Sequence, residues 1–239
     1  MPKINMNKIT IAIDGFSSTG KSTLAKQLAK EMGYVYVDTG AMYRAVAYFA
    51  SQHNLVSETH LDKENLIAQL SNINLRFVFN PDLGFAEMYL NNENVENPIR
   101  TIEVSRLVSK VAEISEVRAK LVEQQQEMGK GKGIVMDGRD IGTVVFPDAE
   151  LKLFMTSSAN TRAQRRFDEL VEKGQRVTFE EVLQNVEERD YIDTNRADSP
   201  LVKADDAIAI DNSAMSKKEQ FDTVLTLVQE KLKLLSIKL

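Results

Sequence analysis

The stretch GFSSTGKS at residues 15–22 decides the fold of this 239-residue chain. It fits the pattern G-x-x-x-x-G-K-[ST] at every fixed position. The apolar run at residues 9–13 predicts a buried parallel strand, and residues 22–32 carry leucine and alanine at helical spacing up to Gly33. A strand, a glycine-containing loop and a helix in this order predict a phosphate-binding loop (P-loop), because loop amides and a helix N-terminus both favour an anion.

The fixed residues of the P-loop have separate expected roles. Lys21 can reach the β- and γ-phosphates of a nucleoside triphosphate, and the Ser22 hydroxyl can ligate Mg²⁺. A chance match in a turn has odds on the order of one in a hundred, and the flanking strand and helix make it rarer. The candidate nucleotide-binding residues are Gly15, Phe16, Ser17, Ser18, Thr19, Gly20, Lys21, Ser22 and Thr23.

A triphosphate site alone fits a kinase of a small acceptor, a regulatory GTPase, or a mechanical or transport ATPase. The chain has no Asn-Lys-x-Asp motif for guanine and no transporter-type Gly-Gly-Gln signature. Both absences favour the small-molecule kinase. A kinase of another acceptor such as UMP, and a P-loop regulatory or nucleic-acid-linked ATPase, stay open as alternatives.

Short apolar runs alternate with helical patterns along most of the chain. This rhythm predicts an α/β fold in which a central parallel sheet lies between helices, a P-loop three-layer sandwich. Further strands are expected at residues 34–37, 134–136, 151–155 and 207–210. Residues 75–79 and 85–90 instead predict an antiparallel hairpin around a five-residue loop.

We expect one kinase unit rather than two tandem domains. Its parts are a core at residues 1–71 and 99–239, a small antiparallel insert near 72–98 and an arginine-rich lid near 160–178. One helix is expected from Thr161 to Lys173, within the lid, and another from Thr178 to about Asp190. Ser115 is expected to cap a middle helix.

The amino-acid composition excludes several kinds of functional site. At 43% hydrophobic and 27% charged, the chain has the composition of an ordinary globular protein. It has no cysteine, which excludes disulfides, a thiol nucleophile and a thiolate zinc site, and its two histidines argue against a His-rich metal centre. The net charge of −5 argues against a nucleic-acid-coating protein.

No targeting or membrane-spanning pattern is recognisable. The apolar run at residues 9–13 is too short for the core of a signal peptide, and no stretch approaches the roughly 18 apolar residues of a membrane span. We therefore expect a cytoplasmic protein with neither a membrane nor a nucleic acid as partner. The hydrophobic pattern indicates no oligomer interface, so a monomer is expected.

Arginines and aspartates gather where ligands bind in open α/β sheets, beyond the carboxyl ends of strands. DTGAMYR at residues 38–44 and DGRD at residues 137–140 both follow expected strands, and residues 189–196 have the spacing R-D-x-x-D-x-x-R. Four more arginines, at positions 162, 165, 166 and 176, lie in the expected lid. Arginine forks neutralise the repulsion between donor and acceptor phosphates, so this pattern favours an anionic acceptor.

Simpler interpretations exist for some of these residues. The lid arginines can form a solvated helix face, Asp137 can cap a helix, and Ser109 can be an ordinary helix-surface serine. Arg118 and Asp140 can form a surface ion pair, which contributes about 0–1 kcal/mol. His53 and His60 are assigned no role.

The chain resembles the bacterial cytidylate kinases, also called CMP kinases, from near its N-terminus to its last helix. The matching segments are IAIDGFSSTGKST (11–23), VDTGAMYRA (37–45), IRTIEVSRLVSKVA (99–112), VMDGRDIGTVVFPDA (135–149) and ERDYIDTNRADSPL (188–201). The antiparallel insert resembles the extra small domain of the bacterial enzymes. Many members have Gly-Lys-Gly-Thr where this chain has Gly-Lys-Ser-Thr, and Ser22 still supplies the hydroxyl.

The resemblance implies the reaction of ATP with CMP or dCMP, giving ADP and CDP or dCDP, with Mg²⁺ bound through Ser22. It implies catalytic roles for Lys21, Arg139, Arg162 and Arg166, and adds Arg165 and Arg176 to the ATP-binding residues of the P-loop. The substrate-binding residues that it implies are Asp38, Thr39, Tyr43, Arg44, Ser109, Arg118, Asp137, Gly138, Arg139, Asp140, Arg189, Asp193 and Arg196.

Three of these residues resemble a set that reads cytosine. Asp140 can accept from the exocyclic amino group, while Arg118 and Ser109 can donate to the ring nitrogen and the carbonyl. Uracil reverses the hydrogen-bonding direction at the 4-position, so it would leave a buried group unpaired. Arg44, Arg139 and Arg189 would surround the acceptor phosphate.

Overall fold

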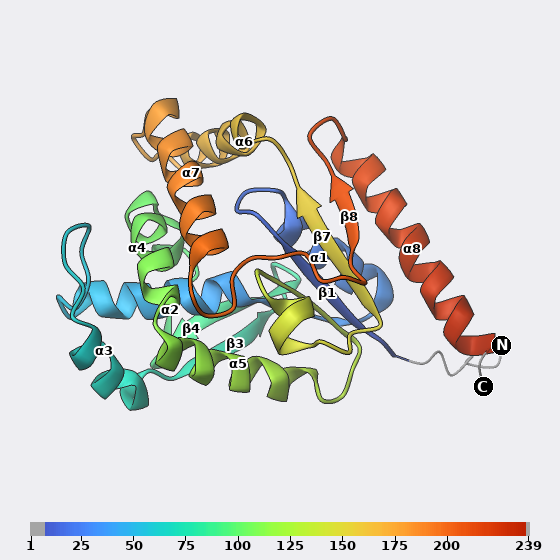
Figure 1. Cartoon of the computed structure of the whole chain (residues 1–239), viewed down its shortest axis with the longest axis horizontal. Coiled ribbons are helices and arrows are strands. Elements are labelled where there is room, and N and C mark those ends of the chain that lie inside the picture. Colours follow the sequence, from blue (N-terminus) through green and yellow to red (C-terminus); the bar gives the residue numbers. More distant parts are fainter. Residues whose placement is uncertain (1–7, 238–239) are drawn as a thin grey trace.

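A parallel five-stranded sheet forms the centre of the protein in a computed structural model that describes residues 8–237 (Figure 1). The strand order is β2-β6-β1-β7-β8, and every pairing in this sheet is parallel. The strands are β1 (Thr10–Gly15), β2 (Val35–Asp38), β6 (Ile134–Gly138), β7 (Leu151–Thr156) and β8 (Ile208–Asp211). The predicted α/β class is confirmed. The outermost residues of the expected kinase unit, 1–7 and 238–239, lie outside the described range.

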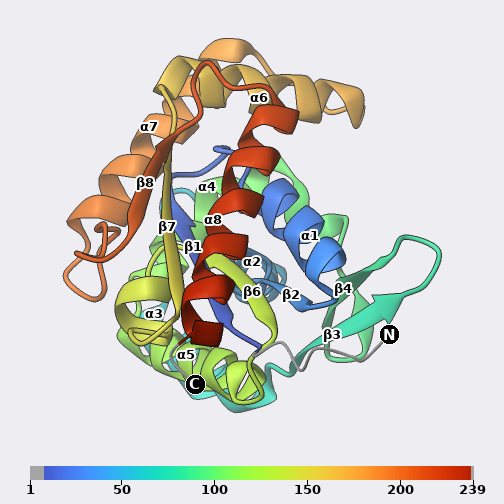
Figure 2. The same ribbon diagram turned by 90° about the vertical axis from the view of Figure 1, so that its right-hand side faces the viewer.

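Helices cover both faces of this sheet, which gives the three expected layers (Figure 2). On one face, α1 (Lys21–Met32) and α8 (Lys217–Ile237) bury leucines and valines against β1, β7 and β8. On the other face lie α2 (Thr39–Gln52), α5 (Ser115–Gly129) and a short π-helix, η3 (Ile141–Val145). Burial of β1 on both faces explains why its sequence is almost continuously apolar.

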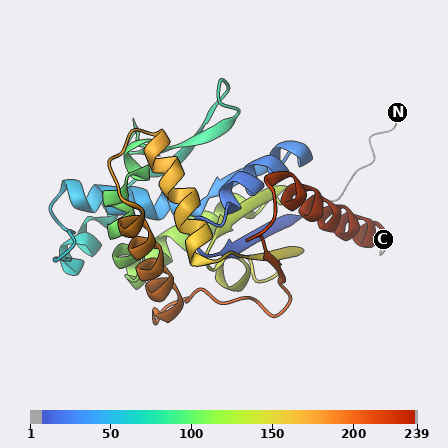
Figure 3. The same ribbon diagram turned by 90° about the horizontal axis from the view of Figure 1, so that it is seen from above.

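A second, antiparallel sheet confirms the predicted hairpin. Strand β3 (Leu75–Asn80) pairs with β4 (Phe85–Leu90), and a two-residue strand, β5 (Glu93–Asn94), adds to the edge. The Asn80 side chain accepts hydrogen bonds from two amides of the turn, and Gly84 has a φ of 72°. Figure 3 shows this hairpin projecting from the body of the protein.

The remaining helices frame one end of the sheet. They are α3 (Lys63–Gln69), η1 (Leu70–Asn72), η2 (Pro98–Arg100), α4 (Ile102–Ala112), α6 (Ala159–Glu172) and α7 (Phe179–Asn195). Helices α6 and α7 pack against each other as a helical hairpin, with Leu170 and Val182 in their shared core. The expected lid near residues 160–178 covers α6 and the connection to α7. Helix α7 begins with a capping box between Thr178 and Glu181, as the predicted start requires.

Three helix boundaries differ from the sequence prediction. Helix α6 begins at Ala159 rather than near Thr161, because Ser158 accepts a hydrogen bond from the Thr161 amide and caps the helix. Helix α7 continues to Asn195, beyond the expected end at Asp190. Ser115 is the first residue of α5 instead of its cap, and the cap position is held by Ile114.

Within residues 8–237, no helix is both long and apolar enough to cross a membrane.

Candidate active site

A cavity of about 640 Å³ opens beyond the carboxyl ends of β1, β2 and β6. It is bounded by the P-loop, the first turn of α2, the end of β6, the helices α4, α6 and α7, and the β3–β4 hairpin. Most of the residues expected from the sequence line it: Ser17, Ser18, Thr19, Gly20, Lys21, Ser22, Thr23, Asp38, Thr39, Tyr43, Arg44, Ser109, Arg118, Asp137, Gly138, Arg139, Asp140, Arg166, Arg189, Asp193 and Arg196.

The glycines of the P-loop are required by its backbone. Gly15 has a φ of 143°, and a Cβ atom there would lie 2.1 Å from the Met155 carbonyl oxygen of β7. Gly20, at the N-cap of α1, has a left-handed φ of 86°. Gly15 and Phe16 do not line the cavity, so they shape the loop from behind. Ser18 also has a positive φ, of 58°.

Lys21 lies folded over this loop. Its Nζ donates to the Phe16 carbonyl at 2.5 Å and to Thr19 Oγ1 at 3.4 Å. Burial, together with the nearby Arg139 guanidinium, lowers the pKa of Lys21 to about 7, against the opposing effect of Asp137. A triphosphate would supply the negative charge that this buried ammonium lacks.

Asp137 joins the P-loop helix to the sheet. Its carboxylate accepts a hydrogen bond from Ser22 Oγ at 2.9 Å and another from Tyr36 Oη at 2.9 Å. Burial and the nearby Asp38 raise the pKa of Asp137 to about 6, although Lys21 and both hydroxyls lower it. Asp137 lies within β6, so the helix-cap interpretation was wrong. The contact of Tyr36 with Asp137 was not anticipated from the sequence.

Asp38 holds two arginines at the cavity wall. It caps α2 by accepting from the Ala41 amide at 2.8 Å, and it forms ion pairs with Arg44 at 3.1 Å and Arg100 at 2.9 Å. Burial alone would raise the pKa of Asp38, but the two guanidinium groups outweigh it and hold that pKa well below its ordinary range. Arg100 was not anticipated, because its partner lies 62 residues away in the sequence.

Several buried polar atoms at the cavity have no hydrogen-bond partner among residues 8–237. They belong to five residues expected to bind the acceptor: Tyr43 Oη, Arg44 Nε, Ser109 Oγ, Arg118 Nε and Arg189 Nε. Buried polar groups are nearly always hydrogen-bonded, so this convergence indicates a polar ligand.

Arg118 and Asp140 form a buried ion pair beside these atoms. The Arg118 side chain is 2% exposed, and its Nη1 also donates to the Ala112 carbonyl at 3.2 Å. The surface ion-pair interpretation was therefore wrong. Ser109, 3% exposed on α4, is likewise not a surface serine.

A second group of charges lies at the end of α7. Arg139 Nε donates to Asp193 at 2.7 Å, which connects the end of β6 to α7. Arg196 lies 3.9 Å from the same carboxylate and donates to the Ser199 carbonyl at 2.8 Å. Three residues of the R-D-x-x-D-x-x-R pattern thus line one cavity: Arg189, Asp193 and Arg196.

The lid arginines divide into two groups. Arg166 lines the cavity and donates to the Arg100 carbonyl at 2.9 Å. Arg162 is 3% exposed, so it does not lie on a solvated face. It lies outside the cavity lining, pairs with Asp190 at 2.5 Å and has its guanidinium 5.1 Å from the Phe16 ring.

Arg165 and Arg176 also lie outside the cavity lining. Arg165 donates to both the side chain and the backbone of Asn212, at 3.0 Å each, and to the Thr19 carbonyl at 3.5 Å. Arg176 is exposed. Their roles in binding ATP stay predictions.

Other lining residues were not anticipated from the sequence. They are Lys26, Leu83, Phe85, Glu87, Glu96, Asn97, Arg100, Ser105, Glu169 and Lys173, together with small or apolar neighbours. Lys26 lies one helical turn after Ser22 on α1, so the sequence spacing could have predicted that it reaches the same cavity. Its Nζ lies 3.7 Å from the Phe85 ring, a contact between α1 and the hairpin that no local pattern predicts.

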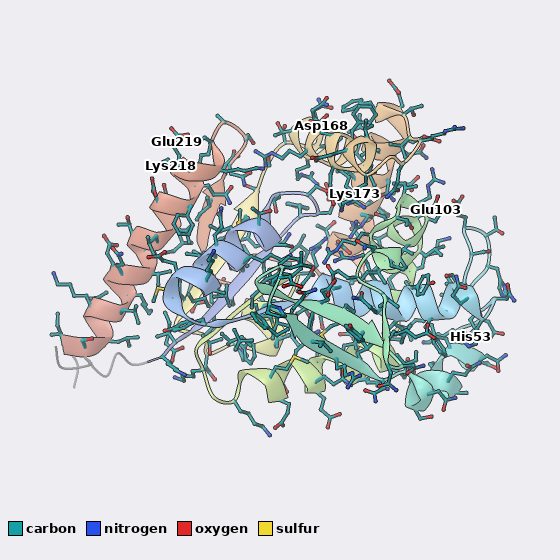
Figure 4. All side chains as sticks on the ribbon, turned by 180° about the vertical axis from the view of Figure 1, so that it is seen from behind. His53, Glu103, Asp168, Lys173, Lys218 and Glu219 are labelled. Carbon is teal, nitrogen blue, oxygen red and sulfur yellow. The ribbon has the colours of Figure 1, made fainter. Side chains whose placement is uncertain are left out.

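His53 does not line this cavity. It stacks on Phe49 with ring centroids 4.0 Å apart, at the end of α2. Figure 4 shows it distant from Lys173, the residue that follows α6. Among the described residues 8–237, no group of three or more His, Cys, Asp or Glu side chains could hold a metal by itself.

Comparison with known proteins agrees with this geometry. The family model described as cytidylate kinase matches residues 11–230. A cytidylate kinase of Flavobacterium johnsoniae is 73% identical over 96% of this chain and all of the relative. Cytidylate kinases of Flavobacterium psychrophilum and Bacteroides fragilis are 68% and 55% identical, over 93% and 95% of this chain and 99% and 100% of their own lengths. The chain belongs to the cytidylate kinase family.

Proposed function

We propose that this protein transfers the γ-phosphoryl group of ATP to CMP or dCMP, giving ADP and CDP or dCDP. The observation that carries the proposal is a single cavity that joins a P-loop to unpartnered buried atoms of Arg44, Ser109, Arg118 and Arg189. The family membership and the relatives called cytidylate kinase support the same acceptor. No observation favours UMP or a regulatory ATPase.

The base of the acceptor would bind at Ser109, Arg118 and Asp140. Asp140 accepts from Arg118, and its remaining lone pairs can accept from the cytosine amino group. Ser109 Oγ and Arg118 Nε, both buried without a hydrogen-bond partner among the described residues, can donate to the carbonyl and the ring nitrogen, although Asp198 lies 3.8 Å from Arg118 Nε. Uracil would present a carbonyl to the Asp140 carboxylate, and such a mismatch costs far more than a change of size.

The phosphates would lie between Lys21 and the arginines. Lys21 and the P-loop amides face the donor, while Arg44, Arg139 and Arg189 surround the acceptor phosphate. These cations reduce the repulsion between the two anionic substrates and hold the attacking oxygen in line. That oxygen belongs to the acceptor, so no side chain need become covalently modified.

The residues present fit Mg²⁺. Ser22 Oγ and the Asp137 carboxylate lie 2.9 Å apart, and this set of hard oxygen donors is one that Mg²⁺ prefers when phosphates complete its coordination. When bound with ATP, Mg²⁺ would neutralise charge on the phosphates. Ser22 would hold it directly, with Asp137 beside it.

We also propose that residues 160–178, in α6 and its connection to α7, act as a lid and that residues 72–98 act as an insert that closes on the acceptor. Support comes from Arg166 and Leu83, which reach the same cavity from these two segments. Closure would exclude water and so limit hydrolysis of ATP. A monomer in the cytoplasm, acting in pyrimidine nucleotide metabolism, completes the proposal.

The test is an assay of the purified protein with Mg·ATP and each nucleoside monophosphate in turn. We expect rapid formation of CDP and dCDP, with UMP, AMP and GMP at least about 100-fold poorer in kcat/KM. Efficient turnover of a different monophosphate, or ATP hydrolysis without any phosphorylated acceptor, would overturn the proposal.

A further inference from the structure

Arg189 is held differently from the other arginines around the cavity. The others pair with carboxylates: Arg44 and Arg100 with Asp38, Arg118 with Asp140, Arg139 and Arg196 with Asp193, and Arg166 with Glu169. Among residues 8–237, no carboxylate forms an ion pair with Arg189, and its Nε has no hydrogen-bond partner. Burial, together with the nearby charges of Arg139, Arg44 and Arg166, lowers the pKa of Arg189 to about 9, against the opposing effect of the Asp193 carboxylate.

The contact that fixes the Arg189 guanidinium is to a neutral hydroxyl. Arg189 Nη1 donates to Ser105 Oγ at 3.0 Å, and Ser105 Oγ in turn donates to Asn185 Oδ1 at 2.8 Å. Ser105 is 2% exposed and Asn185 is 6% exposed. Arginine has no acceptor, so Ser105 must accept from it and must send its only proton to Asn185.

The two packed helices account for this arrangement. Asn185 and Arg189 are four residues apart on α7, so they point from the same face of that helix. Ser105 faces them from α4, which packs beside α7 (Figure 1), and it also lines the cavity. Asn185 therefore sets the direction of the Ser105 hydroxyl, and that hydroxyl sets the position of the guanidinium.

We propose that Ser105 and Asn185 are positioning residues that hold Arg189 at the acceptor phosphate without neutralising its charge. This rests on the proposed function, in which Arg189 binds that phosphate. A carboxylate in place of Ser105 would fix the guanidinium as well, but it would compete with the phosphate. A hydroxyl fixes the same group and leaves its full positive charge to the substrate.

Three variants of Ser105 separate position from charge. Ser105→Ala removes the contact, and we expect KM and Kd for CMP to rise about tenfold, the effect of one hydrogen bond to a charged group. Ser105→Thr keeps the hydroxyl and should stay within about threefold of the wild type. Ser105→Asp holds Arg189 but pairs with it, so CMP should bind more weakly than in Ser105→Ala. KM for ATP should change less than about twofold in all three.

Coupling to Arg189 is the decisive measurement. In an Arg189→Ala background, Ser105→Ala should weaken CMP binding, measured by calorimetry, less than about twofold further, because its effect acts through the missing guanidinium. Asn185→Ala should raise the Kd for CMP several-fold in the otherwise unchanged protein. Gln184→Ala is the matched control on α7, since the Gln184 side chain is exposed and bonds only Glu188.

Three results would overturn the proposal: wild-type CMP binding in Ser105→Ala, an equal rise in KM for ATP, or an undiminished effect of Ser105→Ala without Arg189. Denaturant titration shows whether each variant is folded. If Ser105→Ala does not fold, the Ser105→Thr and Ser105→Asp pair together with Asn185→Ala decides the matter. A wild-type protein that does not phosphorylate CMP contradicts the proposed function instead, which the acceptor assay detects separately.

Discussion

Arg100 Nη2 lies 2.9 Å from Asp38 Oδ2, and the same guanidinium contacts Glu96 at 2.5 Å. Through this arginine the cap of α2 is tied to the end of the antiparallel insert, because Glu96 also accepts from the Met88 amide of β4 at 3.0 Å. Arg166 of α6 donates to the Arg100 carbonyl. The core, the insert and helix α6 thus all contact Arg100, a residue outside the P-loop.

Replacing Arg100 by alanine should destabilise the protein by about 2–4 kcal/mol, because two mostly buried carboxylates lose their shared cation. Denaturant titration of the free protein measures this. Arg106→Ala is the matched control: its two partners, Glu58 and Glu181, are both exposed, so less than about 1 kcal/mol should be lost. Equal effects of the two changes would show that the Asp38–Arg100 contact does not stabilise the fold.

Gly15→Ala should impair the P-loop more than any other single methyl addition to its glycines. The new Cβ would lie 2.1 Å from the Met155 carbonyl oxygen, and the φ of 143° disfavours any side chain. We expect kcat/KM for ATP to fall by at least about 100-fold, since phosphate binding depends on loop geometry. Gly131→Ala, where no atom lies within 4 Å, serves as the control and should leave steady-state kinetics unchanged.

The sequence predicted what depends on local pattern. The P-loop at residues 15–22, the apolar strands and the hairpin follow from residue spacing and turn chemistry, and the structure agrees with them. Contacts between distant segments could not be predicted in the same way. Arg100 was assigned no role from the sequence, because its partner Asp38 lies 62 residues earlier.

The expected lid shows the same limit. Its arginines were treated as one group, yet Arg162 pairs with Asp190 and Arg166 lines the cavity, although the two are four residues apart and share a face of α6. Their contacts depend on which parts of α7 and the P-loop lie beside each position, and the spacing of arginines in the sequence does not specify these neighbours. Ser105, which the sequence assigned to no site, likewise gave no signal of its contact with Arg189.

Arg118→Met should impair use of CMP far more than use of ATP. The change removes the donors expected at the cytosine ring and leaves Asp140 buried without its cation. We expect kcat/KM for CMP to fall by about 100-fold or more, with KM for ATP nearly unchanged. Steady-state kinetics with each substrate varied in turn measures both.

The Arg118 result needs a control for folding. Arg76→Met, at an exposed position of β3, replaces an arginine by the same residue away from the cavity and should leave both KM values unchanged. Comparable losses for CMP and ATP in folded Arg118→Met would argue against a role in reading the base.

Asp14 should make the stability of the protein depend on pH. Its carboxylate is buried and accepts hydrogen bonds from the Ile141 and Gly142 amides at 2.8 and 2.7 Å. Burial raises the pKa of Asp14 from 3.8 to about 6, although these amides oppose the shift. Between the unfolded-state pKa of 3.8 and the folded-state pKa of about 6, Asp14 is therefore protonated more often in the folded state than in the unfolded state. The free energy of unfolding consequently falls as pH rises through this range.

The contribution of Asp14 to this fall is at most about 3 kcal/mol and is complete above about pH 7. Asp14→Asn isolates it, because other titrating groups are common to both proteins. The free energy of unfolding of the wild type minus that of the variant should decrease from pH 4 to about pH 7 and then level off. A difference that is constant over this range, or that grows with pH, would mean that the buried carboxylate is ionised throughout and that the two amides outweigh its desolvation.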